Sequence, residues 1–172
     1  MKIFSIFFSR LFLKFCVVGA SGVIVNAAVL SFCSDILKLH LNISAVIAIF
    51  ISITTNFLLN NTWTFSDRNN PENSILKKWL QFQAVSLAGA LIQWLIFVFC
   101  NYLLFILLSA APDKAQNINR NWIEYWIITP VVNPPDIGYF KYIALMAGIG
   151  TATFWNFIIN FKWTWHKGET VK

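Results

Sequence analysis

The sequence predicts an all-α integral membrane protein with four transmembrane helices, arranged as two helix hairpins in tandem. The chain is 58% hydrophobic and 12% charged, with a mean hydropathy of +0.64, whereas soluble domains are about 45–50% apolar and about 25% charged. Four apolar segments are each long enough to cross about 30 Å of hydrocarbon at about 1.5 Å per residue. The second and fourth segments end in similar sequences, which indicates an internal repeat.

The four apolar segments define the predicted helices. They cover residues 11–34, 43–65, 79–108 and 139–163, and their interiors contain no Asp, Glu, Lys or Arg. Lys14 and Lys141 lie at segment ends, where a long side chain can extend its charge toward water. A chain of 172 residues predicts one domain, so residues 1–172 are expected to form a single transmembrane domain.

The distribution of Lys and Arg predicts the orientation. Nine basic residues flank one side of the predicted bundle, namely Lys2, Arg10, Lys14, Arg68, Lys77, Lys78, Lys162, Lys167 and Lys172. Four lie on the other side, namely Lys38, Lys114, Arg120 and Lys141. Because cytoplasmic loops carry the excess of Lys and Arg, both termini are expected in the cytoplasm of a multi-pass cytoplasmic (inner) membrane protein.

The loop over residues 109–138 is predicted to lie outside the cytoplasm. It contains Trp122–Ile128, which either forms a short interfacial helix or belongs to an ordinary loop with aromatic anchors. Pro130, Pro134 and Pro135 argue against a continuous helix over residues 129–136.

An internal repeat relates the two predicted hairpins. Asn56–Phe65 and Asn156–Trp165 both read Asn-Phe-aliphatic-aliphatic-Asn-x-x-Trp-Thr-aromatic. The first and third helices match more weakly, with Leu13-Lys14-Phe15 against Leu80-Gln81-Phe82, Val18 against Val85, Gly22 against Gly89 and Asn26 against Gln93. Both hairpins begin and end on the same side, so the repeat is predicted to be parallel, as in many transporters.

Amides and small residues recur within the spans. Asn56 and Asn60 are four residues apart and share one helix face, and Asn156 and Asn160 repeat that arrangement. A predicted seam combines Gly22 with Asn26, Gly89 with Gln93, and Ala144 with Gly148 and Ala152. Such residues either hold helices together or bind a polar substrate, because hydrocarbon offers an amide no partner.

Aromatic residues follow each motif. Trp63, Phe65, Trp163 and Trp165 are predicted to form an aromatic belt at the membrane interface, with stacking on a sugar ring as the alternative.

No catalytic or metal-binding pattern is present in the sequence. It contains no Gly-rich phosphate loop, no Ser/His/Asp set and no carboxylate pair, and Cys16, Cys33 and Cys100 are not at ligand spacing from His40 or His166. The basic residues form no stripe with interleaved aromatics. An enzyme, a metal site, a cofactor and a nucleic-acid partner are therefore not expected.

The motifs resemble those of the GtrA-like family, whose fold is also the membrane domain attached to some dolichol-phosphate mannose synthase-type transferases. The resemblance rests on Phe12–Phe15, Val18-Gly19, Gly22, Asn60 through Trp63 to Phe65, and Asn156–Trp165. It implies four transmembrane helices and the flipping of a polyprenyl-phosphate-linked monosaccharide for cell-surface polysaccharide synthesis, beside a membrane glycosyltransferase. The family often has Arg after the motif Asn, where this chain has Asn61 and Phe161, with Lys162 one residue later.

On this hypothesis the prenyl tail stays in lipid while the head group crosses along an amide-lined seam between the hairpins. The expected substrate-binding residues are Asn56, Asn60, Trp63, Asn156, Asn160 and Trp163, with Lys14, Lys77, Lys78 and Lys162 collecting the anionic head group. Because four helices enclose little space, a homodimer or a transferase partner is expected to complete the path.

Two other functions fit the same sequence. A non-catalytic membrane anchor or assembly subunit for a glycosyltransferase would explain the repeat as packing alone. A small multidrug-type exporter also has four helices, but it would need an acidic group within the bilayer, which the interiors of these segments lack.

Overall fold

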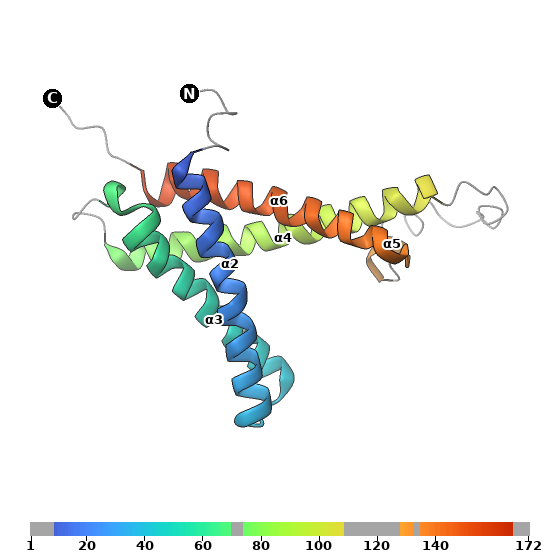
Figure 1. The fold of residues 1–172 in the computed structure, drawn as a ribbon, viewed down its shortest axis with the longest axis horizontal. Coiled ribbons are helices and arrows are strands. Elements are labelled where there is room, and N and C mark those ends of the chain that lie inside the picture. Colours follow the sequence, from blue (N-terminus) through green and yellow to red (C-terminus); the bar gives the residue numbers. More distant parts are fainter. Residues whose placement is uncertain (1–8, 70–73, 109–127, 133–134, 167–172) are drawn as a thin grey trace. The chain divides into compact units, whose positions relative to one another are not determined.

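The computed structural model describes residues 9–69, 74–108, 128–132 and 135–166, and these ranges contain helices without strands (Figure 1). The longer elements are α2 (Arg10–Ser31), α3 (Leu41–Leu59), α4 (Ile75–Leu108) and α6 (Lys141–Ile159). The shorter ones are the π-helical turns η1 (Phe32–Ile36), η2 (Asn60–Thr64) and η7 (Asn160–Thr164), the 3₁₀ turns η3 (Ser66–Arg68) and η6 (Gly138–Phe140), and the single turn α5 (Thr129–Val132).

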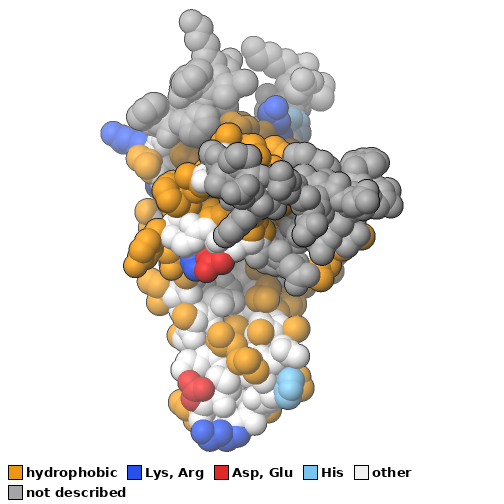
Figure 2. Space-filling model, turned by 90° about the vertical axis from the view of Figure 1, so that its right-hand side faces the viewer, with side chains coloured by type: hydrophobic (Ala, Val, Ile, Leu, Met, Phe, Trp, Pro, Cys, Tyr) orange, Lys and Arg blue, Asp and Glu red, His pale blue; other side chains and the backbone are white. Residues whose placement is uncertain are grey.

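The predicted four-helix membrane architecture is confirmed. Four helices of the described chain are long and apolar enough to cross a membrane, namely Arg10–Ile36, Leu41–Thr64, Ile75–Leu108 and Gly138–Thr164. The third begins at Ile75, ahead of the predicted Trp79, because Lys77 and Lys78 favour helix, Lys77 is exposed and Lys78 finds a hydrogen-bond partner in Asn69. Large apolar side chains such as Val23, Ile24 and Met146 are exposed, as lipid-facing residues are. Figure 2 shows hydrophobic side chains over much of the visible face.

Proline limits the helix that precedes the fourth span. Pro130 falls within α5, where the missing N–H of a first-turn residue is tolerated. The helix ends at Val132 and Pro135–Ile137 are not helical, so no continuous helix covers residues 129–136, as predicted. The predicted interfacial segment Trp122–Ile128 lies outside the described residues, apart from Ile128.

A short connection turns α2 into α3. Asp35 of η1 accepts hydrogen bonds from the hydroxyls of Ser31, the last residue of α2, at 2.6 Å, and of Ser34 at 2.8 Å. Lys38 adopts a left-handed backbone with φ of 55°, and His40 Nδ1 caps α3 by accepting from the N–H of Asn42 at 3.3 Å. The two helices therefore form an antiparallel hairpin.

The described chain forms two compact units. The first contains residues 1–87 and 155–172, and the second contains residues 88–154. The first unit thus holds α2, α3, the beginning of α4 and the end of α6 with η7. The second holds the remainder of α4, α5 and the first part of α6.

An aromatic cluster forms the core of the first unit. Its buried members come from the start of α2, the end of the second span, the start of α4 and the end of the fourth span: Phe15, Phe57, Phe65, Phe82, Phe157 and Trp165. Phe15 meets Phe157 edge-on at 5.5 Å between ring centroids, and Phe57 lies 5.8 Å from Phe82. The beginnings of two spans and the ends of the other two therefore lie together, as the predicted parallel repeat requires.

The pattern of buried side chains follows the same repeat. Positions one hundred residues apart in the second and fourth spans are buried together, namely 44/144, 48/148, 52/152, 57/157, 60/160, 64/164 and 65/165. The first and third spans agree at 15/82, 18/85 and 22/89. The matched sequences thus correspond to matched structural roles, and the small residues Ala144, Gly148 and Ala152 form the predicted buried stripe.

Candidate functional site

The two repeat motifs end in the same backbone distortion. The N–H of Phe65 donates to the carbonyl of Asn60 at 2.7 Å, and the N–H of Trp165 donates to that of Asn160 at 2.9 Å. Each bond spans five residues rather than four, which adds one residue to the turn, a feature frequent at functional sites. Two consecutive residues of each turn are consequently buried, Thr64 with Phe65 and Thr164 with Trp165.

The burial of Phe65 and Trp165 overturns one prediction. Their side chains are 0% and 1% exposed, so they belong to the core and not to an interfacial aromatic belt. The π-helical turn is the reason, because it rotates the last aromatic of each motif inward. Trp63 and Trp163 are 44% and 52% exposed, as the predicted belt or a stacking surface requires.

The motif asparagines Asn60 and Asn160 are almost completely buried but differ in their bonding. The Asn160 amide donates to the carbonyl of Asn156 at 2.8 Å, and its Oδ1 accepts from the hydroxyl of Thr164 at 2.7 Å. In the first copy, Asn60 Oδ1 and Thr64 Oγ1 are buried with no hydrogen-bond partner in the described part of the chain. Among the second asparagines of the two motifs, Asn60 therefore retains an unused acceptor, whereas Asn160 does not.

Polar groups tie the ends of the two motifs together. Trp165 Nε1 donates to Asn61 Oδ1 at 3.1 Å, and Arg68 Nε donates to the carbonyl of Trp165 at 3.0 Å. The Arg68 guanidinium also lies 3.7 Å from the centroid of the Phe161 ring. Burial lowers the pKa of Arg68, but an arginine remains protonated in proteins. Asn61 and Phe161 thus connect the repeats.

The predicted lysines occupy different environments. Lys14 Nζ donates to the carbonyl of Trp63 at 3.4 Å and lies 5.3 Å from its ring centroid. Lys78 is buried and donates to Asn69 Oδ1 at 3.1 Å. Lys77 and Lys162 are exposed. The structure therefore places Lys14 beside a predicted stacking residue and leaves Lys77 and Lys162 accessible.

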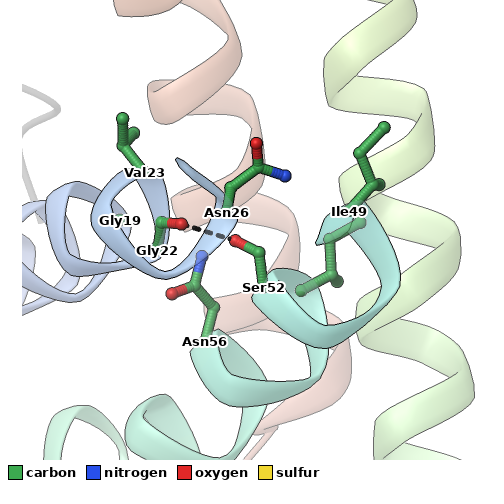
Figure 3. Close-up of a pocket in the computed structure, with 8 residues that line it drawn as sticks. Gly19, Gly22, Val23, Asn26, Ile49, Ser52 and Asn56 are labelled. Carbon is green, nitrogen blue, oxygen red and sulfur yellow. Dashed lines mark hydrogen bonds between the residues drawn. The ribbon is translucent and has the colours of Figure 1, made fainter. Parts of the chain in front are cut away.

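A groove runs between α2 and α3 within the membrane span (Figure 3). It has a volume of about 260 Å³ and is lined by Gly19, Gly22, Val23, Asn26, Ile49, Ser52, Ile53 and Asn56. Gly22 permits the close approach, since an added Cβ would lie 2.8 Å from Asn56 Cγ. The Ser52 hydroxyl donates to the Gly22 carbonyl at 2.7 Å. Asn56 Oδ1 is buried without a partner in the described chain.

A second groove of about 300 Å³ lies in the other unit. It is lined by Ala90, Gln93, Trp94, Phe97 and Leu145. An added Cβ on Gly148 would lie 2.7 Å from the Gln93 carbonyl oxygen, so α4 and α6 approach closely there. Asn26 and Gln93, the matched amides of the predicted seam, each line one groove. Each glycine–amide contact thus joins the two helices of its own hairpin: Gly22 with Asn56 joins α2 to α3, and Gly148 with Gln93 joins α6 to α4.

Some residues of these sites were not predicted from the sequence. No part in a binding site was predicted for Asn61, Arg68, Asn69 or Ser52. Ser52 precedes Asn56 by four residues and therefore shares its helix face, which is a signal that a sequence can carry. The partners of Asn61 and Arg68 lie about a hundred residues away, so local spacing contains no signal for them.

The fold and these sites define a multi-pass membrane protein built from a duplicated helix hairpin. Residues 14–165 match the family described as GtrA/DPMS, transmembrane domain, and the chain therefore belongs to this family. The chain is also 33% identical over 84 residues to a dolichol-phosphate mannosyltransferase of Pyrococcus furiosus. The aligned stretch covers 49% of this chain and 23% of that protein, so the chain matches less than a quarter of the relative's length.

Proposed function

We propose that the protein moves a polyprenyl-phosphate-linked monosaccharide across the cytoplasmic membrane for cell-surface polysaccharide synthesis. Membership of the GtrA/DPMS family supports a role with lipid-linked sugars. The relative's name describes a transferase that uses dolichol phosphate and mannose. On this proposal the protein is not an enzyme, and a membrane glycosyltransferase supplies its substrate.

One observation carries the proposal. Asn56 and Asn156 occupy matched positions of the repeat, and the Oδ1 of each is buried without a hydrogen-bond partner in the described chain. Helix packing does not use these acceptors, although an unpaired buried acceptor costs about 1–3 kcal/mol. A sugar head group presents hydroxyl donors, which would relieve both. Repeat-matched polar groups within the spans are also where transporters of this kind bind substrate.

The charged end of the molecule supports the same proposal. With both termini in the cytoplasm, Lys14, Lys77, Lys78 and Lys162 lie at the entrance and attract the phosphate. Lys77 and Lys162 are exposed for the first encounter. Lys14 lies beside Trp63, whose exposed ring can stack on the sugar. The prenyl tail stays in lipid, and a homodimer or the transferase completes the path.

Reconstitution tests the proposal directly. Purified protein in liposomes with a radiolabelled polyprenyl-phosphate hexose should accelerate access of the inner-leaflet pool to an outside reagent. The double variant Asn56→Leu with Asn156→Leu should lose this acceleration, whereas Met146→Leu, at an exposed position of α6, should retain it. Equal rates in wild-type and empty liposomes, with and without a co-reconstituted transferase, would refute the proposal.

A second candidate is a non-catalytic membrane anchor or assembly subunit for a glycosyltransferase. The match to one part of a mannosyltransferase favours it, because that protein includes a segment similar to this chain. Stable co-purification with a transferase, together with no lipid translocation, would support this role instead. A small multidrug-type exporter is disfavoured, because Asp35 is the one acidic residue within the four spans and it lies in the terminal turn of the first.

A further inference from the structure

We propose that the groove between α2 and α3 binds the sugar ring itself and accepts an uncharged sugar while excluding acidic and amino sugars. The groove is the one lined by Gly19, Gly22, Val23, Asn26, Ile49, Ser52, Ile53 and Asn56. The inference rests on the proposed function and deepens it by assigning a specificity site.

The size of the groove suits one sugar ring. Its volume of about 260 Å³ lies just below the range of about 300–1,000 Å³ that holds drug-sized ligands. The space opens at Gly19, where an added Cβ would meet no atom within 4 Å. The groove lies within the spans of α2 and α3, so a head group that crosses the membrane passes its depth.

The groove offers the ligand both acceptors and the amide N–H donors of Asn26 and Asn56. Ser52 uses its proton on the Gly22 carbonyl, so its oxygen remains available only as an acceptor. Asn56 Oδ1 is a second acceptor and has no partner in the described chain. The amide torsion of an asparagine is soft, and rotation over the flat surface of Gly22 can turn this oxygen toward the groove. Sugar hydroxyls both donate and accept, so they can pair with these acceptors and with the amide N–H groups of Asn26 and Asn56.

The absence of charge sets the second part of the specificity. None of the eight lining residues is ionisable. A carboxylate or ammonium group in this groove would lie within the membrane without a counter-ion from the lining residues, which is costly. A neutral sugar has the required donors and carries no such cost.

Helix packing alone does not explain the arrangement. Glycine and amide residues commonly join membrane helices, and the Ser52–Gly22 hydrogen bond acts in this way. An amide retained for packing would have its oxygen satisfied by the neighbouring helix. Asn56 Oδ1 is buried without a partner in the described chain, so rotation of the amide toward the groove would let a ligand donor satisfy it.

The test compares three lipids that share one polyprenyl phosphate and differ in the sugar: a neutral hexose, a hexuronic acid and an amino hexose. Binding to purified protein is measured by scintillation proximity, and translocation is measured in liposomes. We expect the neutral lipid to bind and cross at least about tenfold better than the other two. Equal binding and equal rates for all three would overturn the inference.

A pair of glycine variants locates the site. Gly19→Leu fills the groove from a position where a Cβ meets nothing within 4 Å, and Gly150→Leu adds the same side chain at an equally open position outside the groove. Gly19→Leu should lose binding of the neutral lipid at least about tenfold, whereas Gly150→Leu should bind as wild type does. If a monodisperse Gly19→Leu protein bound the neutral lipid as wild type does, the inference would be overturned, whether or not the protein translocates lipid.

The two readouts separate this inference from the proposed function. Selective binding that Gly19→Leu abolishes, without any translocation, would support the groove and refute the flippase. Translocation without sugar selectivity would support the flippase and refute the groove. No binding of any of the three lipids would refute the groove.

Discussion

The Phe65 ring and the Trp165 indole stack with centroids 4.4 Å apart and an interplanar angle of 17°. They are the final residues of the two repeat motifs, one hundred positions apart in the chain. The contact therefore joins the ends of the second and fourth spans through equivalent residues of the two motifs. Arg68 and Asn61 fix the same junction by hydrogen bonds to Trp165.

The stacked pair should contribute more to stability than the exposed tryptophan beside it. Trp165→Ala removes a side chain that is 1% exposed and should lower the free energy of unfolding by about 3–5 kcal/mol. Trp163→Ala is the matched control, because it makes the same change at a side chain that is 52% exposed. Thermal unfolding in detergent measures both. Equal losses of stability would contradict the assignment of Trp165 to the core.

Arg68 should not be replaceable by lysine. Its Nε bonds the Trp165 carbonyl while its guanidinium lies on the Phe161 ring, and a lysine ammonium cannot reproduce this planar arrangement. Arg68→Lys should therefore destabilise the protein by about 1–2 kcal/mol. Lys162→Arg, at an exposed position, is the control and should have little effect. Full stability of Arg68→Lys would show that charge alone matters at this position.

The close approach of α2 to α3 should make Gly22 intolerant of a methyl group. Gly22→Ala places a Cβ 2.8 Å from Asn56 Cγ, so the Asn56 amide must move away, and the variant should cost about 1 kcal/mol. Gly19→Ala adds the same methyl where nothing lies within 4 Å, so it should be neutral or stabilise the helix by up to about 1 kcal/mol. Equal melting temperatures of the two variants would argue against this helix contact.

A parallel comparison applies to α4 and α6. Gly148→Ala brings a Cβ to 2.7 Å from the carbonyl oxygen of Gln93, a backbone atom that cannot move independently of its helix. Gly150→Ala meets nothing within 4 Å. Circular dichroism melts should therefore show a loss of about 1–3 kcal/mol for Gly148→Ala alone. Matching melts for the pair would mean that the helices are farther apart at this point.

The spans and the repeat could be predicted from the sequence because both depend on local composition. The apolar length of segment 79–108 was sufficient to predict a span there. Comparison of the chain with itself was sufficient to detect the match of Asn56–Phe65 to Asn156–Trp165. The single-domain prediction and the orientation of the termini stay predictions. The matched burial of Gly22 and Gly89 confirms even the weaker part of the repeat.

The candidate site was predictable only in part. Asn56 and Asn26 were expected to be polar positions in the span, and both line the groove. The inward rotation of Phe65 and Trp165 was not predicted, because an extra residue in a helical turn depends on the distant ring that stacks on it. For the same reason, no local pattern could show that Asn61 meets Trp165.

The different bonding of Asn60 and Asn160 makes one motif asparagine a better test of function than the other. Asn160→Leu removes the acceptor of Thr164 and the donor to the Asn156 carbonyl. It leaves a buried hydroxyl unpaired and should cost about 1–3 kcal/mol. Asn60→Leu removes a buried Oδ1 that has no partner in the described chain. It should therefore leave the melting temperature within a few degrees of wild type.

The two substitutions should accordingly separate stability from transport. If Asn60 Oδ1 accepts a substrate hydroxyl, Asn60→Leu should slow translocation of the polyprenyl-phosphate hexose about tenfold while the protein stays folded, since a lost hydrogen bond of about 1.4 kcal/mol changes a rate by that factor. Thermal unfolding and the liposome assay are run on the same preparations. A well-folded Asn60→Leu protein with wild-type translocation would remove Asn60 from the substrate path, and the groove at Asn56 would remain as the polar site of the first hairpin.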